Sequence, residues 1–320
     1  GHGPKCEQAL HRLDKCQRWF CGRLATWHPT HCCEGCKQGK DHGLQCKQPA
    51  SSMARFQLPN SSPLTECCPT DGGGNFASLT YTKAVVQRSK EVDLSLDLRL
   101  PTGQGPFPCV VFVHGGAWVH GNFQGFTTGP FGQLLCQLGW ACASVQYRFL
   151  QDAPWPAAEC DVRAAVRLLR MNSVQLRLDP QRFVSMGHSA GGHLAGFLAA
   201  AAADLAAEDD VRHVAESESS TVQGIIGYAG AFDGNRFMRD GDLVKRVQES
   251  SGKDGWPPML LIQGTADTMV PKKTAQDMAQ ALRAVEADVR LLFLEGHYHQ
   301  FQLNAPVSDA IATFLRKFTD

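Results

Sequence analysis

Residues 187–191 read Gly187-His188-Ser189-Ala190-Gly191, and this pentapeptide is the strongest indication of the fold in the sequence. A short apolar run at residues 183–186 precedes it, and an alanine-rich run at residues 190–203 follows it. Small residues at both ends permit a sharp strand-to-helix turn, on which a strained serine projects its hydroxyl above a sheet. The start of a helix also directs backbone N–H groups toward developing negative charge. We therefore predict that Ser189 is a nucleophile and that His188 packs within the turn.

Strand-like and helix-like runs alternate on both sides of this turn from about residue 76. Strands are predicted at residues 92–100, 109–113, 141–147, 183–186, 222–228, 259–262 and 289–294. Helices are predicted at residues 129–138, 156–171, 190–203, 272–285 and 306–318. Such alternation is typical of a mostly parallel sheet flanked by helices. The first strand alternates polar and apolar residues, which favours a half-buried position at the edge of the sheet.

A glycine pair follows the second predicted strand, in the sequence His114-Gly115-Gly116-Ala117-Trp118. Hydrolysis of an ester or amide passes through a tetrahedral oxyanion, which backbone N–H groups fixed in advance stabilise. Glycine lets the backbone approach a substrate closely. We predict that the N–H groups of Gly115, Gly116 and Ala190 form this oxyanion hole, and that Trp118 supplies an apolar wall of the pocket.

An acid and a base are expected later in the chain, in that order. Asp267 lies just after the predicted strand 259–262, where side chains meet at the carboxyl edge of a parallel sheet. It is favoured over Asp254 for this reason, and nearby Met269 is a second candidate wall of the pocket. Two histidines follow the last predicted strand, and His299 is favoured over His297 because His-x-Phe leads directly into the last helix. The imidazole would take the serine proton, and the acid would orient the imidazole.

Charge and hydropathy exclude several classes of protein. The 320 residues include 31 Lys plus Arg and 31 Asp plus Glu, so the formal net charge is zero. No basic surface is expected that would attract nucleic acid. No run of about 18 consecutive apolar residues predicts a membrane span. The expected partner is a small ester, free or attached to a polymer or carbohydrate.

Cysteine is unevenly distributed, since nine of the 13 cysteines precede residue 70. A dense cluster in a polar segment is typical of a disulfide scaffold formed in an oxidising compartment. We therefore expect a Cys-rich module at residues 1–50, a linker at 51–75 and a catalytic domain at 76–320. The chain starts at Gly1 without Met, which we interpret as a trimmed, secreted form. The alternative is a zinc site within residues 28–46, where histidines accompany a Cys-x-x-Cys spacing.

Residues 109–318 resemble the α/β-hydrolase superfamily, and more closely its bacterial feruloyl-esterase-like and hormone-sensitive-lipase-like branch. The similarity rests on collinear blocks at residues 111–118, 144–148, 156–167, 179–183, 187–195 and 264–271. It implies a carboxylic ester hydrolase without cofactor or metal, in which Arg148 and Asp161 are structural. Residues 237–257 are short and polar, so little lid is expected, and an open cleft would favour short acyl groups.

Two other functions remain open from the sequence. The motifs at residues 114–118 and 187–191 also resemble arylformamidases of kynurenine breakdown, which are amide hydrolases inside cells; the Cys-rich segment argues against that substrate. Some proteins of this fold have lost the catalytic residues and act as binding proteins. The presence of a serine, an acid and a histidine in the expected order favours an enzyme.

Overall fold

A computed structural model describes residues 76–86, 90–199, 211, 214–234, 241–250 and 255–319. The expected Cys-rich module at residues 1–50 and linker at 51–75 lie outside these residues. The disulfide scaffold and the alternative zinc site therefore lie outside them too.

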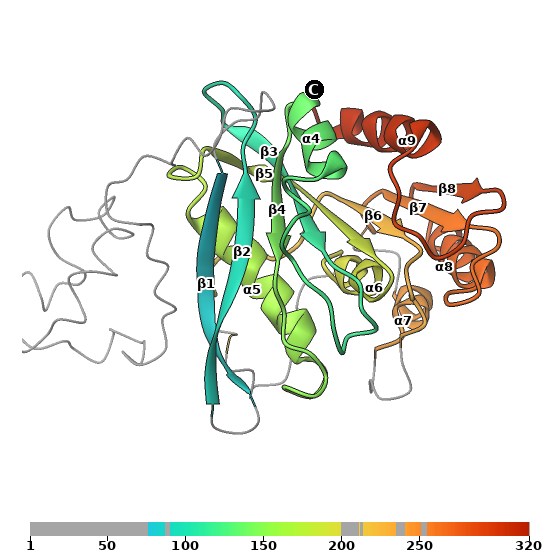
Figure 1. Cartoon of the computed structure of the whole chain (residues 1–320). Coiled ribbons are helices and arrows are strands. Elements are labelled where there is room, and N and C mark those ends of the chain that lie inside the picture. Colours follow the sequence, from blue (N-terminus) through green and yellow to red (C-terminus); the bar gives the residue numbers. More distant parts are fainter. Residues whose placement is uncertain are drawn as a thin grey trace, which may run out of the picture. The chain divides into compact units, whose positions relative to one another are not determined.

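An eight-stranded mixed sheet forms the centre of the described chain, in the order β1-β2-β4-β3-β5-β6-β7-β8 (Figure 1). β1 pairs antiparallel with β2, and β2 antiparallel with β4. All remaining neighbours are parallel. The strands are β1 Phe76–Val86, β2 Lys90–Arg99, β3 Phe107–Val113, β4 Ala141–Val145, β5 Leu178–His188, β6 Gly224–Tyr228, β7 Met259–Gly264 and β8 Val289–Leu294.

Helices cover both faces of this sheet, which is why the central strands are apolar on both sides. On β3, Val111 belongs to one buried cluster and Phe112 to the other. The first cluster takes residues from α5, α6, α7 and α8, and the second from α4 and α9. The helices are α4 Pro130–Gln137, α5 Ala157–Met171, α6 Ala190–Phe197, α7 Leu243–Glu249, α8 Lys272–Ala284 and α9 Ala305–Leu315, with the 3-10 turn Arg316–Phe318 after α9.

The strand predicted at residues 92–100 is not an edge strand, so that expectation was wrong. β1 pairs with β2 along its length and lies outside it. Alternating Leu79 and Tyr81 are buried in β1, and a register irregularity near Thr82 lets Ala84 and Val86 be buried beyond it. With β1 as the edge, the leucines of β2 are almost fully buried.

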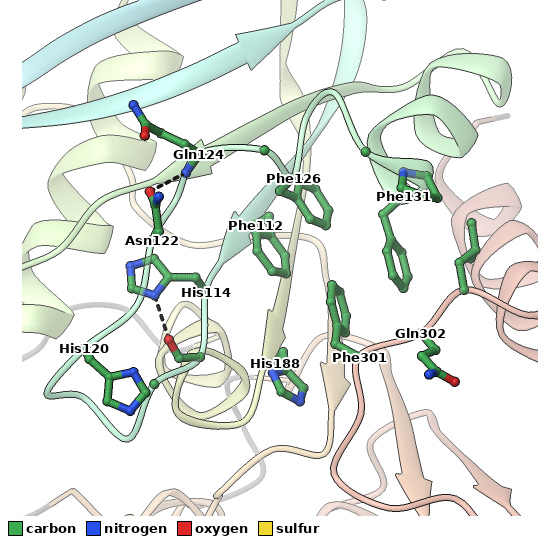
Figure 2. A pocket seen from close by; sticks show the side chains of 16 residues that line it. Phe112, His114, His120, Asn122, Gln124, Phe126, Phe131, His188, Phe301 and Gln302 are labelled. Atoms are coloured by element: carbon green, nitrogen blue, oxygen red, sulfur yellow. Dashed lines mark hydrogen bonds between the residues drawn. The ribbon is translucent and has the colours of Figure 1, made fainter.

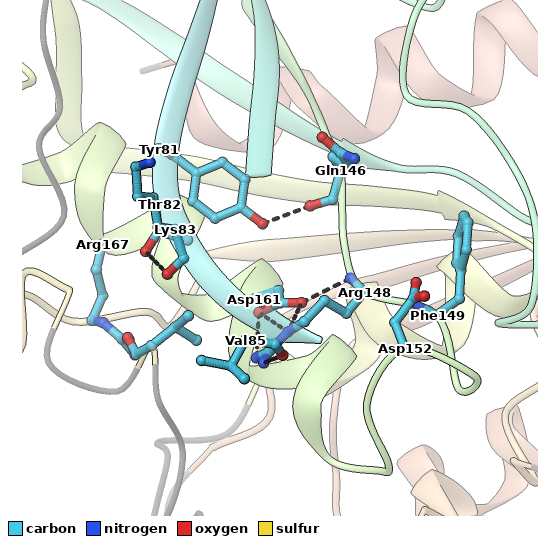
Figure 3. Close-up of polar contacts among 11 residues, drawn as sticks. Tyr81, Thr82, Lys83, Val85, Gln146, Arg148, Phe149, Asp152, Asp161 and Arg167 are labelled. Atoms are coloured by element: carbon cyan, nitrogen blue, oxygen red, sulfur yellow. Dashed lines mark hydrogen bonds and ion pairs between the residues drawn. The ribbon is translucent and has the colours of Figure 1, made fainter. Parts of the chain in front are cut away.

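A buried ion pair and its hydrogen bonds connect β1 to α5 (Figure 3). The Arg148 guanidinium donates to the Asp161 carboxylate at 2.8 Å, and the Arg148 backbone N–H donates to the same carboxylate at 2.8 Å. Arg148 also donates to the backbone oxygen of Val85, at the end of β1, at 3.1 Å. The Tyr81 hydroxyl donates to the backbone oxygen of Gln146 at 2.6 Å. These contacts link β1, the segment after β4, and α5, so their role here is structural.

The cysteines of the described part lie in the sheet and its helices. Cys109 on β3 and Cys142 on β4 are buried, free thiols, and burial raises the pKa of the Cys109 thiol. Cys160 is buried on α5, and Cys136 is half-buried on α4. Cys109, Cys142 and Cys160 lie within the hydrophobic clusters, as small apolar side chains do.

No helix among the described residues is long and apolar enough to span a bilayer.

Candidate active site

Ser189 lies at a sharp turn between β5 and α6. Its backbone has φ 54° and ψ −121°, which is an uncommon conformation for a residue with a side chain. A Cβ at Gly187 would lie 2.1 Å from the Gly191 carbonyl oxygen, and one at Gly191 would lie 2.0 Å from the Val113 carbonyl oxygen. Glycine is therefore required at both positions, because any side chain would collide with the backbone. This packing holds the half-buried Ser189 at the carboxyl edge of the sheet.

Ser189, His299 and Asp267 form one hydrogen-bonded row. The Ser189 Oγ is 2.9 Å from His299 Nε2, and His299 Nδ1 is 2.7 Å from Asp267 Oδ2. The His299 side chain is 13% exposed and the Asp267 side chain is fully buried. The three residues follow strands β5, β8 and β7, which are close together in the sheet. Such a row can transfer the serine proton to the imidazole while the carboxylate stabilises the resulting charge.

The Asp267 carboxylate is held in place by four donors. Its Oδ1 accepts from the backbone N–H groups of Met269 and Val270, each at 2.9 Å. Its Oδ2 accepts from Gln263 Nε2 at 3.0 Å as well as from His299. Gln263 lies on β7, so a rigid strand fixes the direction in which the carboxylate faces.

The other acid and base considered from the sequence are placed differently. His297 contributes its backbone oxygen, which accepts from the Ala266 N–H at 3.0 Å. Its ring takes no part in the row formed by His299. Asp254 lies outside the described residues.

The glycine pair after β3 lies against the serine. A Cβ at Gly115 would be 3.2 Å from the Ser189 Cβ, so the Gly115 backbone approaches the hydroxyl-bearing residue closely. Gly116 has φ 126°, and its carbonyl accepts from the N–H groups of Val119 and His120, both at 3.0 Å. Ala190 is the first residue of α6 and fully buried. The structure thus places Gly115 and Ala190 beside the serine, and Gly116 follows Gly115 directly in the chain.

Two buried histidines support this framework. His114 stacks on Tyr147 with ring centroids 4.4 Å apart, and its backbone oxygen accepts from the Tyr147 hydroxyl at 3.0 Å. His193, on α6, lies with its Nε2 2.6 Å from the Gly241 carbonyl oxygen. Burial lowers the pKa of His114, and it lowers the pKa of His193 to about 4. Both rings are therefore uncharged at neutral pH.

A cavity of about 720 Å³ opens beside the oxyanion loop. Four phenylalanine rings from separate segments form its apolar walls, as Figure 2 shows: Phe112, Phe126, Phe131 and Phe301. Phe112 stacks on Phe126 with centroids 3.6 Å apart, and Phe131 stacks on Phe301 at 4.2 Å. Apart from the apolar Pro130 and Leu303, the remaining lining is polar or glycine: His114, Gly115, Gly116, His120, Asn122, Gln124, Gly125, Gly129, His188 and Gln302.

The two wall residues expected from the sequence do not line this cavity. Trp118 is 5% exposed and packs edge-on against His193, with centroids 5.3 Å apart. Met269 is 73% exposed. Among the four phenylalanines of the wall, Phe301 is marked by a sequence pattern, because it belongs to the His-x-Phe pattern at residues 299–301. Phe112, Phe126 and Phe131 carry no local pattern that marks them as a wall, since only the fold brings them together.

No group of three or more His, Cys, Asp or Glu side chains that could hold a metal occurs among the described residues.

Known protein families match two overlapping parts of the chain. The BD-FAE family matches residues 96–253, and the TAP-like protein family matches residues 238–319. The chain is 31% identical to esterase LipC of Mycobacterium tuberculosis over 249 residues, covering 66% of this chain and 59% of LipC. It is 29% identical to esterase LipQ of the same organism, covering 65% of this chain and 55% of LipQ. The chain thus spans little more than half the length of these relatives.

Solved structures show the same fold. Thermogutta terrifontis esterase 2 with bound propionate is 27% identical and covers 78% of this chain and 93% of its own, with a TM-score of 0.57. A truncated carbohydrate esterase from gut microbiota, at 21% identity, covers 78% of this chain and 97% of its own, with a TM-score of 0.61. The second likeness concerns the fold alone.

Proposed function

Since the chain belongs to the α/β-hydrolase superfamily, we propose that it is a serine esterase that cleaves carboxylic esters of short acyl or aryl groups. The observation that carries this proposal is the hydrogen-bonded row Ser189–His299–Asp267, with distances of 2.9 and 2.7 Å. The esterase names of LipC, LipQ and the Thermogutta enzyme support the same class of reaction.

The proposed mechanism has two halves. Ser189 Oγ attacks the ester carbonyl carbon while His299 Nε2 takes the hydroxyl proton. The oxyanion that forms accepts hydrogen bonds from the N–H groups of Gly115, Gly116 and Ala190. Collapse of this intermediate breaks the bond to the alcohol, which leaves with the proton from His299. Water then attacks the acyl-enzyme by the same route, and the acid is released.

The cavity supports a substrate with a flat or short apolar group. Aromatic rings prefer stacked or edge-to-face partners, and four phenylalanines offer both. Among the described residues that line the cavity, none is Asp, Glu, Lys or Arg. A charged group entering it would lose water without gaining an ion-pair partner. A long alkyl chain would gain about 0.8 kcal/mol per buried methylene only where a long tunnel encloses it.

The decisive experiment combines a substrate panel with loss of the nucleophile. Wild type is assayed on short-acyl, aryl and acetyl-sugar esters and on a formyl-aryl amide, and then treated with an organophosphonate. We expect ester hydrolysis and a covalent label on Ser189. Ser189→Ala should lose roughly three orders of magnitude or more of kcat and stay unlabelled, with an unchanged circular dichroism spectrum. Full activity in the variant, or a wild type neither active nor labelled, contradicts the proposal. A preference for the amide would instead identify the protein as an amide hydrolase.

Secretion forms a separate part of the proposal. Its support is the density of cysteine before residue 70, together with the polar composition there. The measurement is a titration of thiols in the unfolded, unreduced protein. At most the four cysteines after residue 100 and one odd N-terminal cysteine should react. Titration of most N-terminal thiols, with zinc released on chelation, would contradict the disulfide scaffold and the secretion inferred from it.

A further inference from the structure

We propose that His188 is a positioning residue, whose uncharged ring holds His299 in line with Ser189. This inference rests on the proposed function, because it assigns His188 a role through the proposed base. His188 is the residue directly before Ser189 and lines the cavity.

One ring contacts three parts of the site. The His188 ring centroid is 4.9 Å from that of His299, with 40° between the planes, and 5.1 Å from that of Phe301, with 32° between the planes. Its Nδ1 is 2.9 Å from the position that a Cβ on Gly115 would occupy. Figure 2 shows the His188 ring beside Phe301 at one end of the cavity. His188 therefore lies between the base, the cavity wall and the oxyanion loop.

The hydrogen bonds of His299 leave one motion of its ring unopposed. Asp267 binds Nδ1 and Ser189 binds Nε2, so the two bonds define an axis through the ring. Rotation about this axis tilts the ring while keeping both bonds short. A contact against the ring face opposes that tilt, and the tilted ring of His188 supplies it.

The two histidines also differ in the rigidity of their backbones. His188 ends β5 and pairs with Tyr228 in the register of β5 with β6. His299 lies in a loop between β8 and α9. Since the strand is fixed by the sheet, contact with His188 transfers that rigidity to the loop that carries the base.

The contact requires an uncharged ring. Burial and, to a smaller extent, the neighbouring His299 ring lower the pKa of His188 to about 4, while Asp267 and a hydrogen bond with the His299 backbone oppose the shift. A positive charge at His188 would oppose the imidazolium that His299 becomes during proton transfer. The other titratable ring packed against His188 is Tyr228, with centroids 6.0 Å apart. The His188 Nε2 atom has no hydrogen-bond partner among the described residues, so shape matters more than hydrogen bonding at that atom.

The experiment measures the rate of Ser189 phosphonylation alongside kcat and KM. Phosphonylation needs the base but no natural substrate, so it reports on His299 whatever ester the enzyme prefers. His188→Ala should slow phosphonylation and lower kcat by about 10- to 100-fold, since small misplacements of a catalytic group have effects of this size. His188→Phe keeps an uncharged ring and should stay within about fivefold of wild type. His297→Phe is the matched control, and we expect wild-type rates.

A pH profile separates positioning from a general loss of packing. In His188→Glu, a carboxylate beside His299 stabilises the imidazolium. The acidic limb of kcat/KM should therefore shift to higher pH by about one unit. Wild-type rates in His188→Ala, equal damage in His188→Phe and His188→Ala, or an unmoved limb in His188→Glu would each overturn the proposal. A wild type that is neither labelled nor active would instead remove the proposed function, and this inference with it.

Discussion

At the scale of single residues, Ser189 shows how packing maintains a strained backbone. Its positive φ of 54° costs on the order of 1–3 kcal/mol. The conformation persists because the turn is bonded on both sides: the Ser189 N–H donates to Tyr228, and its carbonyl accepts from Gly192, both at 2.9 Å. The same packing brings the Gly115 backbone to the serine. The strained backbone of Ser189 and the close approach of Gly115 to it thus have one cause.

The choice between the two histidines gives a direct test at this scale. His299→Ala should lower kcat/KM by roughly three orders of magnitude or more, because Ser189 then has no acceptor for its proton. His297→Ala should stay within about threefold of wild type, because the backbone hydrogen bonds of His297, its N–H to Leu294 at 3.2 Å and its oxygen from Ala266 at 3.0 Å, do not depend on its side chain. Steady-state kinetics on one ester at neutral pH measures both. A larger loss in His297→Ala than in His299→Ala would show that the base is assigned to the wrong residue.

The residues of the row Ser189–His299–Asp267 could be predicted from the sequence, and those of the cavity could not. The row could be predicted because each member follows a strand, and parallel strands end at one edge of the sheet. The cavity walls could not, because Phe112, Phe126 and Phe131 meet only after the chain has folded. Trp118 was placed in the pocket for its position after the glycine pair. Its backbone φ of 60° accompanies a side chain that packs into the core instead.

At the scale of elements, the central strands and longer helices were predictable and two short or peripheral elements were not. Continuous apolar runs mark β3, β6 and β7, which are buried throughout. β1 was missed because its register irregularity interrupts the alternation of buried residues. α7 was missed within a stretch considered too short and polar. Its visible signal is Asp242, whose carboxylate accepts from the Lys245 N–H at 2.9 Å as an N-cap.

The ion pair that joins β1, the segment after β4, and α5 predicts a large effect on stability. Arg148→Met leaves the Asp161 carboxylate buried without its partner, so we expect a loss of about 3–5 kcal/mol in the free energy of unfolding. Replacing both residues, Arg148→Met with Asp161→Leu, should cost less than the single change, because neither charge of this pair then remains buried. Urea unfolding followed by circular dichroism measures each value.

A matched control for this pair is the exposed pair Lys83–Asp93, whose side chains are 65% and 56% exposed. Lys83→Met should change stability by less than about 1 kcal/mol. If Arg148→Met lowered the free energy of unfolding as little as Lys83→Met does, the buried pair would not stabilise the fold.

At the scale of the whole molecule, the two buried clusters have different roles: one packs behind the helix that follows Ser189, and the other contributes to the cavity wall. Helices α5 to α8 pack on one face of the sheet, and α4 and α9 pack on the other. The cavity takes Phe112 from the second cluster, Phe131 from α4, and Phe301 from the loop before α9. The proposed substrate pocket is therefore an opening in one hydrophobic layer, while the opposite layer fixes Ser189 through α6.

The lowered pKa values of two histidines should make the stability of the folded protein depend on pH. Burial lowers the pKa of both His188 and His193 to about 4 in the folded protein. An unfolded chain has histidines with a pKa of about 6.5. Between these values the unfolded chain binds protons that the folded protein does not, so stability falls as pH drops below about 6.5. Two carboxyls act in the opposite sense, because burial raises the pKa of Asp97 and Asp233.

The size of this effect can be measured with one matched pair of variants. At pH 5 His188 and His193 should each lower the free energy of unfolding by about 2 kcal/mol relative to pH 7, and the two carboxyls act against this effect. His193→Gln keeps an amide donor for the Gly241 carbonyl but cannot titrate, so its loss of stability between pH 7 and pH 5 should be about 2 kcal/mol smaller than that of wild type. His297→Gln, which changes a half-buried histidine in the loop after β8, is the matched control for the loss of a histidine. Urea unfolding at pH 7, 6 and 5 gives all three slopes. Equal slopes in His193→Gln and wild type, or a wild type as stable at pH 5 as at pH 7, would mean that the protein does not keep these rings uncharged when folded.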